Sequence, residues 1–179
     1  MNNTIRIQQL VISAVCLALC MVLPFLTGQI PEIGSMLSPM HIPVLLCGFL
    51  CGPAWAAVVG AIAPLLRFAL FGMPPLFPVG VAMCVELATY GAVSGVLYRF
   101  LPRKPVSIYA SLITAMLAGR IVWGIVRAAL AGATGSAFTW AAFMSGAFTS
   151  AVPGIILHIV LIPLIVMALQ KALPWLRNK

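Results

Sequence analysis

The amino-acid sequence predicts an all-α integral membrane protein, with a single domain of six transmembrane helices over residues 1–179. Composition is the first reason: 63% of the residues are hydrophobic and 7% are charged, with a mean hydropathy of +1.17, whereas a soluble domain carries about 25% charged residues. The second reason is the pattern, because the apolar residues form long runs and not the polar–apolar alternation of a membrane β-barrel. In lipid, such runs satisfy their backbone hydrogen bonds as helices.

The first two apolar runs differ in length. The first covers residues 10–26 and is expected to stay as a helix, because no small-residue cleavage site of a secretory signal follows it. Pro24 is expected to bend or end this helix. A polar connection at 27–39 leads to the second run, 41–50. This run is shorter than the roughly 20 residues that cross a bilayer upright, so it either borrows preceding residues or is shielded by its neighbours.

Proline and glycine separate the remaining runs. A tight turn at 51–53 leads into the third run, 54–71, and a stiff proline loop follows at 72–77. The fourth run, 78–100, begins at Pro78, since the first helical turn tolerates proline well. A basic loop at 101–105 precedes the fifth run, 106–131, and a loop of small residues at 132–139 precedes the last run, 140–173. Pro153 and Pro163 are expected to kink the last helix.

The lysines and arginines near the helix ends predict the orientation. With both termini on the cytoplasmic side, no outer loop carries a Lys or Arg, as the positive-inside rule requires of a protein in the cytoplasmic membrane. The net charge of +8 therefore reflects membrane topology and does not indicate nucleic-acid binding. The basic residues that this arrangement places in the cytoplasm are Arg6, Arg99, Arg103, Lys104, Lys171, Arg177 and Lys179.

Arg67, Arg120 and Arg127 are not explained by orientation. A charge inside an apolar run is costly unless it is paired or ligated, so each is a candidate binding residue. Arg120 and Arg127 are seven positions apart, close to two helical turns, and so share a face about 10 Å apart. Trp123 lies between them. Guanidinium groups bind carboxylates in a bidentate fork and the indole offers a packing wall, so this face suits an elongated ligand with an anionic group.

Glu86 and His41 complete the candidate set. Glu86 lies roughly 12 Å inside the fourth run, and His41 lies at the outer start of the second. Glu86 is expected to pair with Arg67 or Arg120, which still leaves excess positive charge for an anionic ligand. Two structural alternatives stay open: Arg127 snorkels to the outer headgroups, and His41 only packs. His158 is expected to be a hydrogen-bonded packing residue.

Other kinds of chemistry are not indicated. The five cysteines lie in or beside apolar runs without a CxxC pair, which is typical of packing residues, so neither a disulfide nor a metal site is expected. The chain has two acidic residues and neither an HExxH nor a Walker motif, so no enzymatic activity, no ATP hydrolysis and no cofactor are predicted. Small-xxx-small pairs, such as Gly48/Gly52 and Gly91/Gly95, favour close helix packing.

The six runs, the alanine pair in the first helix, the long connection after it and the stretch HIPVLLCGFLCGP…PLLRFALFGMPPLFP together resemble the substrate-binding (S) components of energy-coupling factor (ECF) vitamin transporters. The resemblance covers essentially the whole chain. It implies a subunit that binds a vitamin with high affinity near the outer face. It also implies docking through Ala14 and Ala18 on a transmembrane coupling protein, which two ABC-type ATPases energise.

The excess of arginines favours a vitamin with a carboxylate. Pantothenate is the first expectation, and the quoted stretch also resembles family members assigned to pantothenate; folate, nicotinate and biotin stay open, and cationic thiamine is disfavoured. The alternatives from other classes are a stand-alone secondary carrier or channel for a small organic anion, and an assembly or scaffold protein that binds no small molecule.

Overall fold

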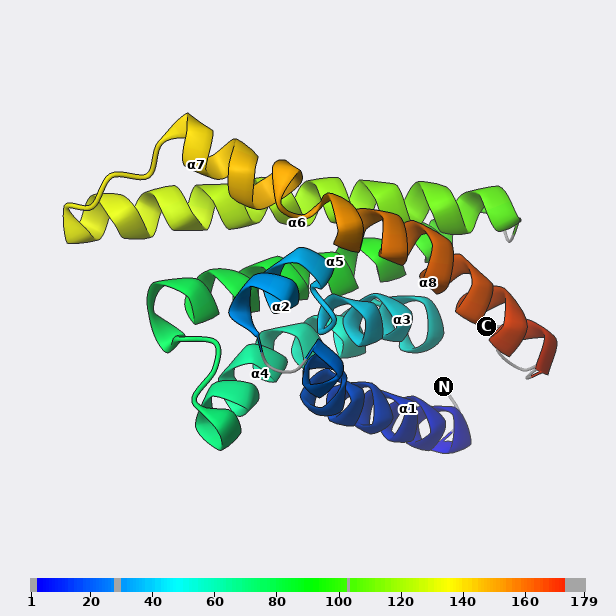
Figure 1. The fold of residues 1–179 in the computed structure, drawn as a ribbon. Helices are drawn as coiled ribbons and strands as arrows, with labels where there is room; N and C mark the ends of the chain where they lie inside the picture. The colour runs from blue at the N-terminus through cyan, green and yellow to red at the C-terminus, as the bar shows by residue number, and fades with distance from the viewer. Residues whose placement is uncertain (1–2, 28–29, 103, 173–179) are drawn as a thin grey trace.

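The computed structural model describes residues 3–27, 30–102 and 104–172, and these ranges contain helices and turns but no strand. The helices are shown in Figure 1. Their bounds are α1 Asn3–Val22, α2 Pro31–Leu37, α3 His41–Cys51, α4 Pro53–Phe71, α5 Val81–Phe100, α6 Pro105–Thr134, α7 Trp140–Met144 and α8 Val152–Ala172. Short helical turns follow α1 (Leu23–Thr27), precede α5 (Leu76–Gly80) and follow α7 (Ser145–Thr149).

The short helix α3 is the centre of the bundle. It packs against α1, α4, α5 and α8, and all of its residues, His41–Cys51, are buried. Figure 1 shows α1 on one side of it and α6 with α7 on the other. Of the two possibilities for the short second run, shielding by the neighbouring helices is therefore the one that the structure adopts.

Within the described ranges, five segments are long and apolar enough to cross a membrane: Ile5–Leu26, Pro53–Phe71, Leu76–Phe100, Pro105–Thr134 and Trp140–Ala172. The prediction of an all-helical membrane protein is confirmed for the described residues, whereas α3 is too short to count as a sixth span by the same measure. The beginning of α1 and the end of α8 lie at the same end of the bundle (Figure 1). Which membrane side this end faces stays a prediction.

The last run, predicted as one helix with kinks, is interrupted. It forms α7, a π-helical segment at Ser145–Thr149, a turn at residues 150–151, and then α8, which starts immediately before Pro153. Proline has no N–H to donate and its ring clashes with the carbonyl four residues earlier, so a helix readily restarts with proline in its first turn. Pro163 lies inside α8, which continues through it. Residue 173, the predicted end of this run, lies outside the described residues.

Two segments near the N-terminus also differ from the prediction. α1 begins at Asn3 and not at residue 10, and it ends at Val22, shortly before Pro24 as proline would dictate. The polar connection at 27–39 contains a short helix, α2, which begins at Pro31 and ends where Ser38 adopts a left-handed backbone conformation (φ 46°). This helix and turn bring the connection over the start of α3.

Small residues let α4 and α5 approach closely, as the small-xxx-small pattern predicted. A Cβ atom added to Gly91 would lie 2.6 Å from the backbone carbonyl carbon of Ala56. One added to Gly95 would lie 2.6 Å from the backbone nitrogen of Pro53. The α4–α5 contact is the most extensive one between any two described helices. It therefore fixes the relative positions of the side chains that these two helices carry.

Candidate functional site

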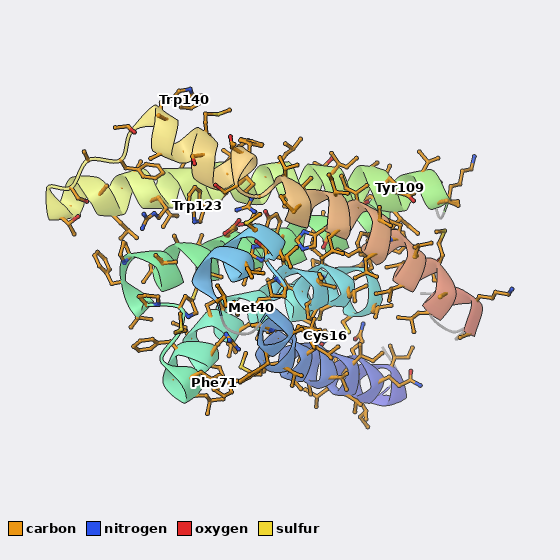
Figure 2. The ribbon with its side chains drawn as sticks, in the orientation of Figure 1. Cys16, Met40, Phe71, Tyr109, Trp123 and Trp140 are labelled. Atoms are coloured by element: carbon orange, nitrogen blue, oxygen red, sulfur yellow. The ribbon has the colours of Figure 1, made fainter. Side chains whose placement is uncertain are left out.

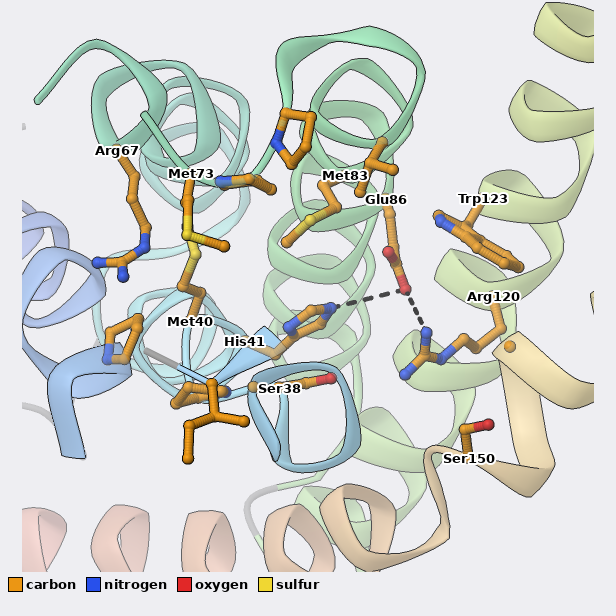
Figure 3. A pocket seen from close by; sticks show the side chains of 18 residues that line it. Ser38, Met40, His41, Arg67, Met73, Met83, Glu86, Arg120, Trp123 and Ser150 are labelled. Atoms are coloured by element: carbon orange, nitrogen blue, oxygen red, sulfur yellow. Dashed lines mark ion pairs between the residues drawn. The ribbon is translucent and has the colours of Figure 1, made fainter. Parts of the chain in front are cut away.

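A cavity of about 570 Å³ lies between α2, α3, α4, α5, α6 and the α7–α8 connection. Five of the six residues that the sequence singled out line it. They come from four different helices, as Figure 3 shows: His41 from α3, Arg67 from α4, Glu86 from α5, and Arg120 and Trp123 from α6. The volume falls within the roughly 300–1,000 Å³ of typical small-molecule sites.

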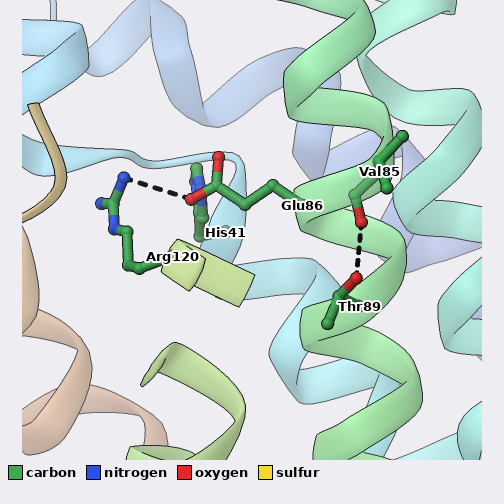
Figure 4. A network of polar contacts seen from close by, with 5 residues as sticks. All are labelled: His41, Val85, Glu86, Thr89 and Arg120. Atoms are coloured by element: carbon green, nitrogen blue, oxygen red, sulfur yellow. Dashed lines mark hydrogen bonds and ion pairs between the residues drawn. The ribbon is translucent and has the colours of Figure 1, made fainter. Parts of the chain in front are cut away.

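Glu86 is the polar residue around which one end of the cavity is built. Its side chain is almost completely buried, and its Oε1 atom lies 3.1 Å from Arg120 Nη1 and 3.6 Å from His41 Nε2. Figure 4 shows the carboxylate pointing between these two partners. Of the two arginines that could pair with Glu86, the structure therefore brings Arg120 to it. A buried carboxylate needs such a partner, since an unpaired buried charge is strongly destabilising.

Tyr90 also belongs to this cluster, although the sequence analysis did not single it out. It is 1% exposed, its side chain hydrogen-bonds Glu86, and its ring lies 5.1 Å from that of His41. The spacing of Tyr90 from Glu86 could have indicated this role, because residues four apart on a helix are neighbours on one face.

Arg67 marks a different part of the cavity. It is 4% exposed, its Nη1 donates a hydrogen bond of 2.9 Å to the Met21 carbonyl, and its guanidinium lies 5.4 Å and 5.3 Å from the ring centres of Phe25 and Phe71. The Met21 carbonyl belongs to the last turn of α1, where carbonyls lack partners within the helix and form the negative end of its dipole. No carboxylate among the described side chains lies within ion-pair distance of Arg67.

Arg127 does not line this cavity. Its guanidinium lies 6.0 Å from the ring centre of Trp123 and 5.6 Å from that of Phe138, next to a separate hollow of about 50 Å³. Arg127 follows Arg120 by two turns of α6, so it lies beyond the end of the cavity. The segment before α7 covers α6 at this point. Trp123 therefore separates Arg127 from the other candidates, and its ring lies 6.0 Å from that of Phe138 and 6.4 Å from that of Phe143. In Figure 2 Trp140 points away from the bundle.

His158 packs behind His41, in agreement with its predicted role. It is 3% exposed, its ring is stacked on His41 at 6.0 Å, and it hydrogen-bonds the backbone of Ser38. It is not among the residues that line the cavity.

The charges in the described cavity wall are two arginines and one glutamate, so the wall keeps one net positive charge with histidine neutral. No group of three or more His, Cys, Asp or Glu residues that could hold a metal ion occurs in the part of the chain that the structure describes. The arrangement is suited to binding a small anionic molecule in a largely apolar pocket.

Comparison with protein families gives a match over most of the chain. A family model described as "ECF transporter, substrate-specific component" matches residues 8–166. No curated protein and no solved structure matches the chain significantly.

Proposed function

Because the chain belongs to the family of ECF transporter substrate-specific components, we propose that it is the high-affinity binding subunit of an ECF-type importer for a carboxylate-bearing vitamin. Members of this family are transporter subunits and not enzymes, and the five long apolar segments agree with a multi-pass membrane protein. The nature of the vitamin, the site residues and the docking surface are the parts of this function that we infer.

The choice of a carboxylate rests on the surroundings of Arg67. Arg120 already has a carboxylate partner in Glu86, whereas Arg67 has none among the described side chains. Withdrawing a guanidinium from water costs several kcal/mol unless an anion compensates it. A carboxylate that enters the cavity would supply this compensation and would form charge-assisted hydrogen bonds with the guanidinium fork.

Pantothenate is our first candidate, and folate, biotin and nicotinate are the other carboxylate vitamins to compare with it. All are small enough to be considered for a cavity of about 570 Å³. Thiamine is disfavoured, because it would bring a cation to a wall that already has a positive charge.

The proposed docking surface is the exposed face of α1. Ala14 and Ala18 are exposed there, next to Val15 and Leu19, which are 53% and 38% exposed. The two alanines are one helical turn apart, so a partner helix could approach the α1 backbone closely between them. The partner that we propose is the coupling protein of an ECF module with its two ATPases.

Thermal unfolding of the purified protein in detergent tests the proposal. The panel is pantothenate, folate, biotin, nicotinate, riboflavin, thiamine and cobalamin. A ligand that binds only the folded state at a hundredfold excess over its Kd stabilises it by about 2.7 kcal/mol. We expect one carboxylate vitamin to raise the unfolding midpoint of the wild type, and of the exposed-site control Arg99→Gln, but not of Arg67→Gln. A shift with thiamine or riboflavin only would contradict the carboxylate and leave the family membership intact.

A further inference from the structure

One end of the cavity gathers buried polar atoms that have no hydrogen-bond partner among the described residues. They are His41 Nδ1 and Nε2, Glu86 Oε1 and Arg120 Nε, none of which makes a hydrogen bond of good geometry with a described residue. His41 and Glu86 are 4% and 1% exposed, and all three residues line the cavity. Native proteins satisfy nearly all of their buried polar atoms, so this cluster is suited to a bound molecule that supplies both donors and acceptors.

The charge at this end is already balanced. Glu86 is in ion-pair contact with Arg120, so a second carboxylate here would be repelled by Glu86, and a cation would be repelled by Arg120. The group that fits is therefore uncharged. It would donate a hydrogen bond to the Glu86 carboxylate and accept one from Arg120 or His41, as hydroxyl, amide and ureido groups do.

Arg67 lies at the other end of the cavity. Figure 3 shows it on the side of α4, away from Glu86 and Arg120. Its one described hydrogen bond goes to a neutral backbone carbonyl, that of Met21, so its positive charge stays available to an anion. The aromatic rings of Phe25 and Phe71, which contact each other edge to face, both pack against the guanidinium.

Methionine side chains separate the two ends. Met40, Met73 and Met83 line the cavity, and in Figure 3 Met73 and Met40 lie between Arg67 and His41, with Met83 next to Glu86. Thioether side chains are apolar and adapt their shape to a ligand. This middle part of the cavity is therefore suited to methylene or methyl groups and offers no partner for a charge.

We propose that the substrate spans the cavity in one orientation: its carboxylate binds Arg67, an apolar spacer lies against the methionines, and an uncharged hydrogen-bonding head binds His41, Glu86 and Arg120. This inference rests on the proposed function and narrows it to acids of that class. Pantothenate, with its hydroxyl and amide groups, and biotin, with its ureido ring, have this construction. Nicotinate, whose carboxylate is attached directly to a small ring, does not.

The test is binding calorimetry on the full chain in detergent with matched acid and neutral ligands: pantothenate and pantothenol, biotin and biotinamide, nicotinate and nicotinamide. The variants are Arg67→Gln, Arg120→Gln and the double variant Glu86→Gln/Arg120→Gln, which keeps the local charge balanced and so protects folding. Arg99→Gln, at an exposed position in the last turn of α5, is the matched control.

We expect pantothenate or biotin to bind and its neutral counterpart to bind roughly 10- to 100-fold more weakly, as the loss of a charged hydrogen bond implies. In Arg67→Gln this difference should fall to about threefold or less. In the double variant both members of the pair should weaken together while the difference between them persists, since only the head contacts are lost.

A difference that persists in Arg67→Gln but disappears in Arg120→Gln would overturn the orientation and leave the proposed function standing. Tight binding of nicotinate alone would contradict the proposed apolar spacer and uncharged head. The proposed function, binding of a carboxylate vitamin, would still stand. Binding of nicotinamide or another neutral member without its acid would overturn both the inference and the proposed carboxylate substrate.

Discussion

Arg120 Nη1 lies 3.1 Å from Glu86 Oε1, and the side chain of Glu86 is 2% exposed. This contact decides how the cavity uses its two arginines, because the one carboxylate in the described wall is already engaged by Arg120. The charge of Arg67 is then the one that a ligand can neutralise. The pair also joins α5 to α6 at one end of the cavity, so its loss has consequences for stability as well as for binding.

Removing one partner of this pair should destabilise the protein more than removing both. Glu86→Gln leaves Arg120 as a buried charge without its carboxylate, and Arg120→Gln does the same to Glu86, so each should lower the free energy of unfolding by about 3–5 kcal/mol. The double variant leaves no unpaired charge and should lose clearly less than the sum. Unfolding in one detergent without ligand, with Arg99→Gln as the control, measures this coupling. Additive losses would show that the two side chains do not stabilise each other.

The α4–α5 contact should depend on the absence of a side chain at Gly91. Alanine is a better helix former than glycine by about 1 kcal/mol, but the added Cβ at Gly91 would lie 2.6 Å from the Ala56 carbonyl carbon. Since helix backbones on both sides would have to move apart, we expect Gly91→Ala to lower the free energy of unfolding by about 1–3 kcal/mol.

Gly132→Ala is the matched control, because Gly132 lies in α6 and a Cβ added there meets no atom within 4 Å. This substitution should be neutral or slightly stabilising in the same unfolding experiment. Equal effects of the two substitutions would mean that helix propensity, and not the close approach of α4 to α5, controls stability at Gly91.

The sequence predicted most of the helices, because long apolar runs in lipid have no other way to satisfy the backbone. It left open which arginine pairs with Glu86, because the sequence does not show which helices pack side by side, and the packing of α5 against α6 is what brings Arg120 to Glu86. It placed Arg127 with the other candidates because the helical period brings it onto the face of Arg120. Helical periodicity predicts which side chains share a face of α6, but it does not predict how far along that face the cavity extends.

Other features were missed for reasons of local chemistry. The break before α8 follows from Pro153, but whether proline kinks or interrupts a helix depends on how neighbouring segments satisfy the freed carbonyls. The helix α2 lies in a short polar segment without apolar periodicity. Met40, Met73 and Met83 looked like ordinary apolar residues, and their role in the cavity wall depends on contacts between α3, α5 and the loop before α5.

Arg127 provides a test of where the site ends. Its guanidinium lies against the rings of Trp123 and Phe138 and outside the main cavity. We therefore expect Arg127→Gln to change the affinity for the bound vitamin by less than about threefold, whereas Arg67→Gln should weaken it roughly 10- to 100-fold, the value of a charged hydrogen bond. Calorimetric titration of both variants gives the comparison. An equal loss in Arg127→Gln would mean that the ligand extends beyond Trp123 to the end of α6.

Substitutions on the exposed face of α1 should prevent docking on the coupling protein without changing vitamin binding. Leucine at Ala14 or Ala18 would fill the space in which a partner helix approaches, while the cavity wall, which contains neither residue, stays unchanged. We expect Ala14→Leu and Ala18→Leu to keep vitamin affinity within about twofold and to lose most of the uptake into cells that express an ECF module. The control is Ala110→Leu, the same change at an exposed position of α6, which should retain uptake.

The same experiment distinguishes a subunit from a self-sufficient carrier. A stand-alone carrier would transport its anion in liposomes without any ATPase, so leucine on the exposed face of α1 should leave its transport intact, or should impair binding and transport together through misfolding. Uptake that is lost while binding persists requires a second protein that contacts α1. If Ala110→Leu caused the same loss, the effect would come from helix insertion or lipid contact, and the docking role of Ala14 and Ala18 would have to be abandoned.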